Sequence, residues 1–229
     1  MVIEEYYGPL RRQMLRDIAA DVKTLSASVG RERLSERVME VMTKVQRHHF
    51  VPIEVQAFAY ANTPLPIGHG KTISQPFIVA LMTDLLDLSP TDRVLEIGTG
   101  FGYQAAVLAE LAGAVHTVEI IEALQLRAKK TLDQLGYKNI EFRLGNGAYG
   151  WPEKGPFDKI ILTAAPELIP PALLEQLKPS GKLVLPAGPA DNQLLMLVER
   201  DAASRLTSRT ILPVRFSQLD EQGPIEGDA

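Results

Sequence analysis

A glycine-rich segment near the middle of the chain has the residue types of a ligand-binding loop. It reads Glu96-Ile97-Gly98-Thr99-Gly100-Phe101-Gly102 and follows the short apolar run Val94-Leu95. Glycines suit such a loop because the backbone must turn tightly and approach a ligand that a Cβ atom would hold away. The segment therefore predicts a binding loop at the end of a strand. A tight strand-to-helix turn without a ligand is the alternative interpretation.

The residues around this loop distinguish a dinucleotide cofactor from a cofactor without phosphate. The dinucleotide fingerprint needs a third small residue three positions after its second glycine, and Tyr103 stands there. Glu96 suits a ligand with an amino group, and Glu119, after the next expected strand, is placed to accept from two ribose hydroxyls. S-adenosylmethionine carries an ammonium group and a ribose but no phosphate. The pattern resembles a class I methyltransferase, with a cofactor site of Glu96, Gly98, Thr99, Gly100 and Glu119.

A second motif, Gly70-Lys71-Thr72, matches only the end of the phosphate-binding loop of nucleoside triphosphatases. That loop needs a further glycine five residues before Gly70, where this chain has Leu65. The motif also follows an irregular stretch instead of a clear strand. We therefore reject a nucleoside-triphosphate site here.

The hydrophobic pattern predicts the elements that must position these residues. Helical spacing predicts helices over residues 10–25, 34–45, 77–88, 103–112, 121–135 and 171–177, the second with Ser35 as its N-cap. Short apolar runs predict strands over 94–97, 115–119, 140–144, 158–163, 182–185, 194–199 and 210–216. Residues 62–70 hold two prolines and two glycines, which predicts a loop.

This alternation of strands and helices predicts an α/β fold. We expect a doubly wound, Rossmann-like and mostly parallel sheet with an antiparallel hairpin at its C-terminal edge. The whole chain, 1–229, is expected to be one methyltransferase domain. Within it we expect an N-terminal helical extension (1–45), a substrate loop and helix (46–90), the cofactor-binding sheet (91–219) and a frayed tail (220–229).

The composition excludes several classes of function. The 229 residues include 24 basic and 28 acidic side chains, and a net charge of −4 argues against non-specific binding of nucleic acid. The absence of cysteine excludes disulfides, Cys-ligated metal sites and thiol nucleophiles. Glu4 and Glu5 do not suit a signal peptide, and Asp84, Glu110 and Glu167 interrupt the longest apolar stretches. We therefore expect a cytoplasmic protein.

Three sequence blocks carry a more specific resemblance. They are Pro64-Leu65-Pro66-Ile67-Gly68-His69-Gly70-Lys71-Thr72-Ile73-Ser74-Gln75-Pro76, Leu95-Glu96-Ile97-Gly98-Thr99-Gly100 and Gly102-Tyr103-Gln104, with supporting matches at Gly150-Trp151-Pro152-Glu153, Thr163-Ala164-Ala165 and Val214-Arg215-Phe216. Together they strongly resemble the protein-L-isoaspartate O-methyltransferases, from about residue 45 to residue 219. The resemblance implies S-adenosyl-L-methionine as cofactor. It implies methyl esterification of L-isoaspartyl, and also D-aspartyl, carboxylates in damaged proteins and peptides, which starts their repair.

The resemblance also assigns roles to individual residues. It implies that the Ser74 hydroxyl is the catalytic group that bonds the substrate carboxylate, although Ser74 would also suit an N-cap of the following helix. Thr72 and Ile73 would help to hold the substrate, and Val214 would pair with the peptide like a strand, with core packing as its alternative role. Asn146 and Gly147 would contact the cofactor's adenine, where the family usually has aspartate at position 146.

The expected chemistry agrees with the residues that are present. A carboxylate is ionised at neutral pH, so methylating it requires no general base. The four histidines, His48, His49, His69 and His116, form no evident base or metal constellation. The reaction needs alignment of the reacting groups and exclusion of water. We expect no metal site, and we expect a monomer whose partners are damaged proteins, not nucleic acid or membrane.

Two other functions remain open at this point. A methyltransferase of the same fold could act on a small molecule or on RNA, but the net charge and the Ser74 block argue against it. A methyltransferase-like binding protein without turnover is the second alternative. Asn146 and Phe101, where the family usually has aspartate and serine, are the residues that favour it. We expect Asn146 to weaken or retune cofactor binding without abolishing it.

Overall fold

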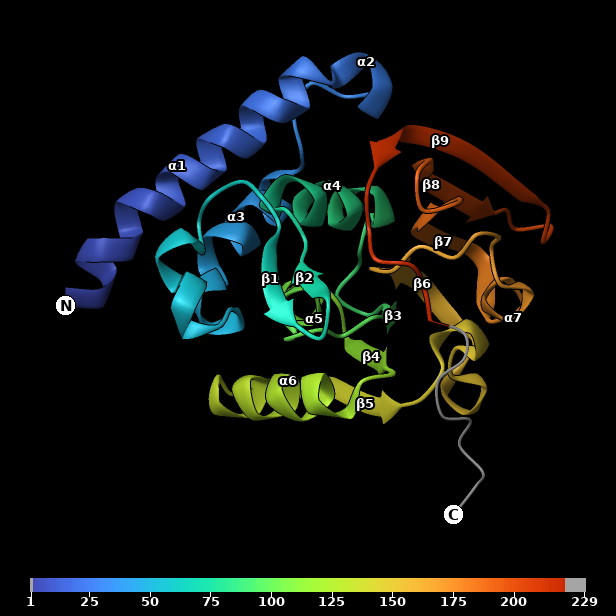
Figure 1. Ribbon diagram of the computed structural model, residues 1–229. Helices are drawn as coiled ribbons and strands as arrows, with labels where there is room; N and C mark the ends of the chain where they lie inside the picture. Colours follow the sequence, from blue (N-terminus) through green and yellow to red (C-terminus); the bar gives the residue numbers. More distant parts are fainter. Residues whose placement is uncertain (1, 221–229) are drawn as a thin grey trace.

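A seven-stranded sheet forms the centre of the computed structural model, which describes residues 2–220, with side chains from residue 5 (Figure 1). Its strand order is β5-β4-β3-β6-β7-β8-β9. The strands are β3 (Arg93–Ile97), β4 (Ala114–Glu119), β5 (Ile140–Leu144), β6 (Phe157–Leu162), β7 (Leu177–Ala187), β8 (Gln193–Arg200) and β9 (Leu206–Val214). The five strands β5, β4, β3, β6 and β7 run parallel. Strand β8 pairs antiparallel with β7, and β9 pairs antiparallel with β8. The expected mostly parallel sheet with an antiparallel C-terminal edge is confirmed. The predicted tail beyond residue 220 lies outside the described residues.

Helices cover both faces of this sheet. They are α1 (Val2–Thr24), α2 (Ser26–Val29), α3 (Glu36–Lys44), α4 (Pro76–Leu86), α5 (Tyr103–Ala109), α6 (Glu122–Gln134) and α7 (Pro171–Glu175). Short 3₁₀ turns lie at η1 (Arg47–Phe50), η2 (Ile53–Phe58), η3 (Gly147–Tyr149) and η4 (Pro152–Lys154). Along β6, Ile161 packs into the core of α1, α3, α4 and α5, whereas its neighbours Ile160 and Leu162 pack into the core on the α7 side. The strand period of two therefore builds two separate cores.

The N-terminal helices pack on the outside of α4 (Figure 1). Met14, Ile18 and Val22 lie four residues apart on α1 and are buried, as the helical spacing predicts. Helix α4 is buried at every position because it lies between the sheet and these outer helices. Ser35 is the N-cap of α3, and its side chain accepts a hydrogen bond from the Val38 N–H, which confirms the predicted cap.

A two-stranded hairpin precedes α4, where the sequence predicts a loop. Strand β1 (Leu65–Gly68) pairs antiparallel with β2 (Lys71–Ile73). Prolines and glycines suggest a loop, but Leu65 and Ile67 alternate with exposed Pro66, and an isolated hairpin edge tolerates the missing proline N–H. His69 at φ 53° between two glycines of positive φ makes the turn. The loop predicted over residues 62–70 was therefore wrong for residues 65–68, which form β1.

None of the helices in the described part of the chain has the length and apolar character that a membrane crossing requires.

Candidate functional site

A cavity lies at the C-terminal ends of the central parallel strands, where open α/β sheets bind ligands. The ends of β3, β4 and β6 supply Ile97, Val118 and Thr163, and the turns after them supply the rest of the floor. The β1–β2 hairpin contributes Ile67, Lys71 and Thr72 to its wall. The loop of glycines after β3 therefore lines a real cavity, as the binding-loop prediction requires.

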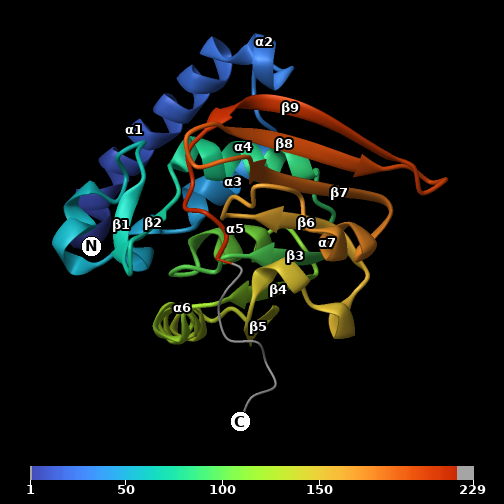
Figure 2. The same cartoon turned by 45° about the vertical axis from the view of Figure 1, so that its right-hand side comes forward.

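The C-terminal segment forms another wall of this cavity. After β9 the chain turns back across the ends of the strands, as Figure 2 shows, and Ser217 to Asp220 line the cavity. The Ala165 N–H donates to the Ser217 carbonyl at 2.9 Å, and the Leu219 N–H donates to the Ala165 carbonyl at 2.9 Å. Nothing in the composition of this segment indicates that it returns to the sheet, so the sequence alone does not place it in the site.

The glycine loop has a backbone geometry that other residues rarely adopt. Gly98, Gly100 and Gly102 all have positive φ, at 95°, 55° and 92°. A Cβ atom on Gly98 would lie 2.4 Å from Oγ1 of Thr163. The loop therefore needs glycine both for its backbone conformation and for its close approach to β6.

Glu119 presents a fixed carboxylate to the cavity. Its Oε2 accepts from the Gly100 N–H at 2.8 Å, and its Oε1 accepts from the N–H groups of Ile120 and Ile121 at 2.9 and 3.0 Å. The side chain is nearly buried but lines the cavity. A carboxylate has about four acceptor positions, so it retains capacity for the hydroxyls of a ligand.

Glu96 lies behind the glycine loop and not in the cavity wall. It is fully buried, and its Oε2 accepts from the Thr117 hydroxyl at 2.6 Å. The Thr117 and Thr99 hydroxyls are also 2.6 Å apart, so a chain of hydrogen bonds joins Glu96 to the loop. Its Oε1 has no partner among the described residues, and burial raises the pKa of Glu96 to about 8. The geometry thus does not offer the direct contact with a ligand amino group that the sequence suggested.

A second opening, a cleft of about 540 Å³, adjoins the first cavity. The segment before α4 supplies Ser74 to it, the end of β9 supplies Val214, and α1 supplies Asp21. Thr72 and Thr163 line both openings, and they also line a small cavity that Ser74 shares. Ser217 also lines both openings, which therefore meet at Thr72, Thr163 and Ser217, beside Ser74.

Ser74 is free to contact a ligand. The N-cap of α4 is Gln75 without a side-chain cap, and the Phe77 N–H in the first turn donates to Oδ1 of Asn62 at 3.0 Å. No described residue forms a hydrogen bond with the Ser74 hydroxyl, and the residue is half-buried. The structure therefore gives the capping role to Asn62, and Ser74 lines the cleft with a hydroxyl that bonds no described residue.

The remaining predicted substrate residues lie on the same two walls. Ile73 is buried and lines the small cavity beside Ser74, whereas Thr72 is exposed at the junction. Val214 pairs with Gln193 at the end of β9 and is half-buried on the cleft. Its position suits both pairing with a peptide and packing on the core.

Asn146 and Gly147 lie at the end of β5, beside the cavity. Gly147 lines it, and a Cβ there would come within 2.2 Å of Cγ2 of Ile97. Asn146 is buried, and its Oδ1 accepts from the Ala148 N–H at 2.8 Å. The asparagine therefore holds the turn that presents Gly147, and only the glycine is in the cavity wall.

Thr163 is a site residue whose importance the sequence did not reveal. Its Oγ1 donates to the Gly98 carbonyl at 2.6 Å and lies 3.1 Å from the Ile97 carbonyl. In the sequence it was only one of several residues supporting a resemblance. Its position directly after β6 is the sequence feature that could have indicated a site residue. Strand β6 lies next to β3 in the sheet, so the residue after it lies beside the glycine loop.

The histidines lie elsewhere. His48 stacks on Tyr7 at 4.1 Å between ring centroids and lies 2.9 Å from the Tyr60 hydroxyl, so it anchors α1. His116 is a buried residue of β4, as expected, and burial lowers its pKa. The described residues contain no group of three or more His, Asp or Glu side chains that could hold a metal ion.

The sheet topology, the glycine loop after β3 and the acidic residue that ends β4 are the arrangement of Rossmann-like methyltransferases. A family model described as Protein-L-isoaspartate(D-aspartate) O-methyltransferase (PCMT) matches residues 21–223. The chain belongs to this family.

Individual relatives agree with the family match. A protein-L-isoaspartate O-methyltransferase 1 of Polaromonas sp. is 55% identical over 221 residues, covering 96% of this chain and 94% of the relative. A protein-L-isoaspartate O-methyltransferase 2 of Syntrophobacter fumaroxidans is 52% identical, covering 94% and 88%. A solved protein-L-isoaspartate O-methyltransferase is 26% identical with a TM-score of 0.77, covering 91% of this chain and 65% of that chain. A Plasmodium falciparum structure, determined with S-adenosyl-L-homocysteine, shares the fold at 21% identity and a TM-score of 0.72, covering 90% and 98%.

Proposed function

We propose that this chain transfers a methyl group from S-adenosyl-L-methionine to the free carboxylate of L-isoaspartyl, and also D-aspartyl, residues in damaged proteins and peptides. The observation that carries the proposal is the junction at Thr72 and Thr163. There the cavity lined by the glycine loop and Glu119 adjoins, beside Ser74, the larger cleft of about 540 Å³. Membership of the family supports the same reaction.

The residues of the first cavity fit S-adenosylmethionine. Gly98 and Gly100 bring bare backbone to the cavity, Gly147 does so from the next loop, and Glu119 adds a carboxylate held by three N–H groups. A carboxylate and glycine backbone suit a ribose and a cationic ligand better than a pyrophosphate, which would be repelled by Glu119. When bound, the cofactor supplies an electrophilic methyl group on a positively charged sulfur.

Glu96 and Thr99 would act on the cofactor from behind the loop. The hydrogen bonds from Glu96 through Thr117 to Thr99 fix the loop that carries Gly98 and Gly100. We therefore assign Glu96 a positioning role, and Asn146 a similar role toward Gly147. The loss of the family's aspartate at position 146 then affects how the turn is held more than how adenine is bonded.

The residues that contact the peptide need only to orient its carboxylate. An isoaspartyl carboxylate is already ionised at neutral pH, so no residue needs to remove a proton. The Ser74 hydroxyl donates a hydrogen bond to one carboxylate oxygen, which orients the other oxygen toward the junction. Thr72, Ile73 and Val214 hold the peptide on either side, and the apolar walls exclude water from the meeting point.

A matched set of peptides tests the function. The purified protein is incubated with methyl-labelled S-adenosylmethionine and peptides that differ only in carrying L-isoaspartate, D-aspartate or L-aspartate at one position. We expect label on the L-isoaspartyl peptide, less on the D-aspartyl peptide and none on the L-aspartyl peptide. Cofactor binding, measured by calorimetry, without methylation of any peptide would contradict the proposal and favour a binding protein.

The monomeric state and the cytoplasmic location stay predictions from the sequence, as does the absence of a nucleic-acid partner. Light scattering coupled to gel filtration measures the first. Methylation assays with total RNA in place of the peptides test the last, and labelling of RNA would contradict it.

A further inference from the structure

Asp21 contributes the one carboxylate among the described residues that line the 540 Å³ cleft. It lies near the end of α1, where the chain turns into α2 beside the end of β9 (Figure 1). The same cleft contains Ser74 and Val214, which the proposed function assigns to the substrate. Asp21 therefore faces the space through which a bound peptide would run.

The position of this carboxylate is fixed relative to Ser74. The Asn62 amide nitrogen donates to Oδ2 of Asp21 at 2.7 Å, and its Oδ1 accepts from the Phe77 N–H at 3.0 Å. Both ends of the Asn62 amide are thus occupied, which fixes its orientation. Phe77 lies three residues after Ser74, so two hydrogen bonds connect Asp21 to the segment that carries the Ser74 hydroxyl.

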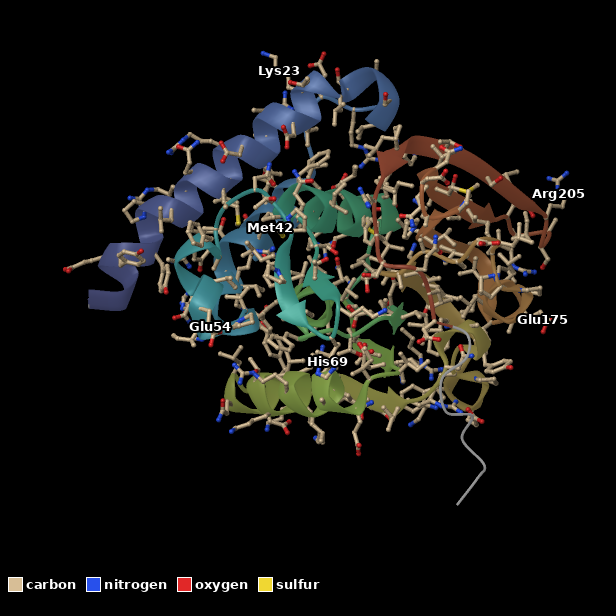
Figure 3. All side chains as sticks on the ribbon, in the orientation of Figure 1. Lys23, Met42, Glu54, His69, Glu175 and Arg205 are labelled. Carbon is tan, nitrogen blue, oxygen red and sulfur yellow. The ribbon has the colours of Figure 1, made fainter. Side chains whose placement is uncertain are left out.

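No cation of the described residues forms an ion pair with Asp21. Lys23, two positions later, points away from the body of the molecule, as Figure 3 shows. Arg215, the single basic residue of the described cleft lining, is exposed and forms no ion pair with it. Asp21 is half-buried and shares the cleft with the apolar side chains of Leu25, Phe77 and Leu212, so a Coulombic interaction there is stronger than in open water.

We propose that Asp21 is a specificity-determining residue, which favours isoaspartyl substrates that carry a lysine or arginine close to the damaged residue and disfavours those with acidic neighbours. Its Oδ1 is available to accept from an ammonium or guanidinium group. The family model begins at residue 21, so the helix that presents this charge lies almost wholly outside the matched region. This inference rests on the proposed function and extends it to the choice of substrate.

A peptide series measures the preference. Isoaspartyl peptides carry lysine, glutamine or glutamate at one position at a time, among the two positions before isoaspartate and the two positions after it. The value of kcat/KM is measured for each peptide. At one or more positions we expect wild-type protein to prefer lysine over glutamate by roughly two- to fivefold, the range of a partly exposed ion pair. The preference should shrink as salt is added, because screening weakens it.

Three variants of α1 assign the preference to Asp21. Asp21→Asn keeps an acceptor for Asn62 and should reduce the lysine-to-glutamate ratio to about one, whereas Asp21→Lys should invert it. Asp17→Asn, one helical turn earlier, is the matched control. Asp17 does not line the cleft, and its Oδ1 accepts from Gln13 on α1, so its replacement should leave the ratio unchanged.

A binding measurement gives a second readout. The affinity of the same peptides is measured by fluorescence anisotropy with S-adenosylhomocysteine present, and Asp21→Asn should lose the difference between lysine and glutamate peptides. Equal kcat/KM for all charges in wild type, or an unchanged ratio in Asp21→Asn, would overturn the inference while leaving the function intact. Failure to methylate any isoaspartyl peptide would instead overturn the proposed function.

Discussion

The Thr163 hydroxyl donates a 2.6 Å hydrogen bond to the carbonyl of Gly98, across the gap between the ends of β6 and β3. This contact joins the glycine loop to a residue that, like Thr72, lines the cofactor cavity, the peptide cleft and the small cavity beside Ser74. A single side chain therefore connects the conformation of the cofactor loop to the shape of the place where the two substrates meet.

Removing this hydroxyl should loosen the cofactor loop. Thr163→Val keeps the shape of the side chain but leaves the Gly98 carbonyl without its donor, at a cost of about 1 kcal/mol. We expect the affinity for S-adenosylhomocysteine, measured by calorimetry, to fall about three- to tenfold. Thr163→Ser retains the hydroxyl and should bind nearly as well as wild type. Equal affinities for the Val and Ser variants would show that the hydrogen bond does not fix the loop.

A methyl group on Gly98 should also disrupt the hydrogen bond between the Thr163 hydroxyl and the Gly98 carbonyl. Its Cβ would lie 2.4 Å from Oγ1 of Thr163 at φ 95°, so the threonine must turn away and lose its hydrogen bond. We expect Gly98→Ala to lower the free energy of unfolding by about 2–4 kcal/mol, or the melting temperature by roughly 6–12 °C.

Gly136→Ala is the matched control for this substitution. Gly136 has φ 86°, but nothing lies within 4 Å of its added Cβ. The control therefore measures the cost of the backbone conformation alone, about 1–2 kcal/mol. Similar losses of stability in the two variants would mean that the approach to Thr163 contributes little.

Much of this site follows from local sequence signals. The glycine loop and Glu119 could be placed because each lies at the end of a short apolar run, and parallel strands end at the same edge of a sheet. Ser74 could be identified because it lies in a block of consecutive residues that resembles the family. These are features of a few consecutive residues, so the sequence displays them directly.

What could not be predicted depends on contacts between distant segments. The β1–β2 hairpin forms because Leu65 and Ile67 find a buried surface, and prolines and glycines conceal that alternation. Burial of Glu96 depends on how tightly the loop closes over Thr117, and the role of Asp21 depends on how α1 packs on α4. None of these relationships leaves a pattern in neighbouring residues.

The Ser74 hydroxyl should matter for the peptide and not for the fold. It caps no helix in this structure, because Asn62 bonds the first turn of α4. We expect Ser74→Ala to lower kcat/KM for an isoaspartyl peptide about tenfold or more, with S-adenosylhomocysteine affinity within about twofold of wild type. Thermal unfolding should change by less than about 2 °C. Equal losses of cofactor affinity and turnover would assign Ser74 a structural role instead.

The buried carboxyl of Glu96 should make stability depend on pH in a defined direction. Burial raises its pKa from 4.5 to about 8, so between these values the folded protein keeps a proton that the unfolded chain releases. The folded state thus binds more protons there, and stability falls as the pH rises from about 4.5 to about 8. Glu96→Gln removes this titration and retains an oxygen for the Thr117 hydroxyl.

The free energy of unfolding by urea, measured for both proteins at pH 5.5 and pH 8.5, tests this dependence. Other groups titrate equally in the two proteins, so the difference between them isolates Glu96. We expect that difference to move in favour of Glu96→Gln by roughly 1–3 kcal/mol between the two pH values. A difference that does not change with pH would show that Glu96 is ionised in the folded protein, with a cation or solvent reaching its Oε1.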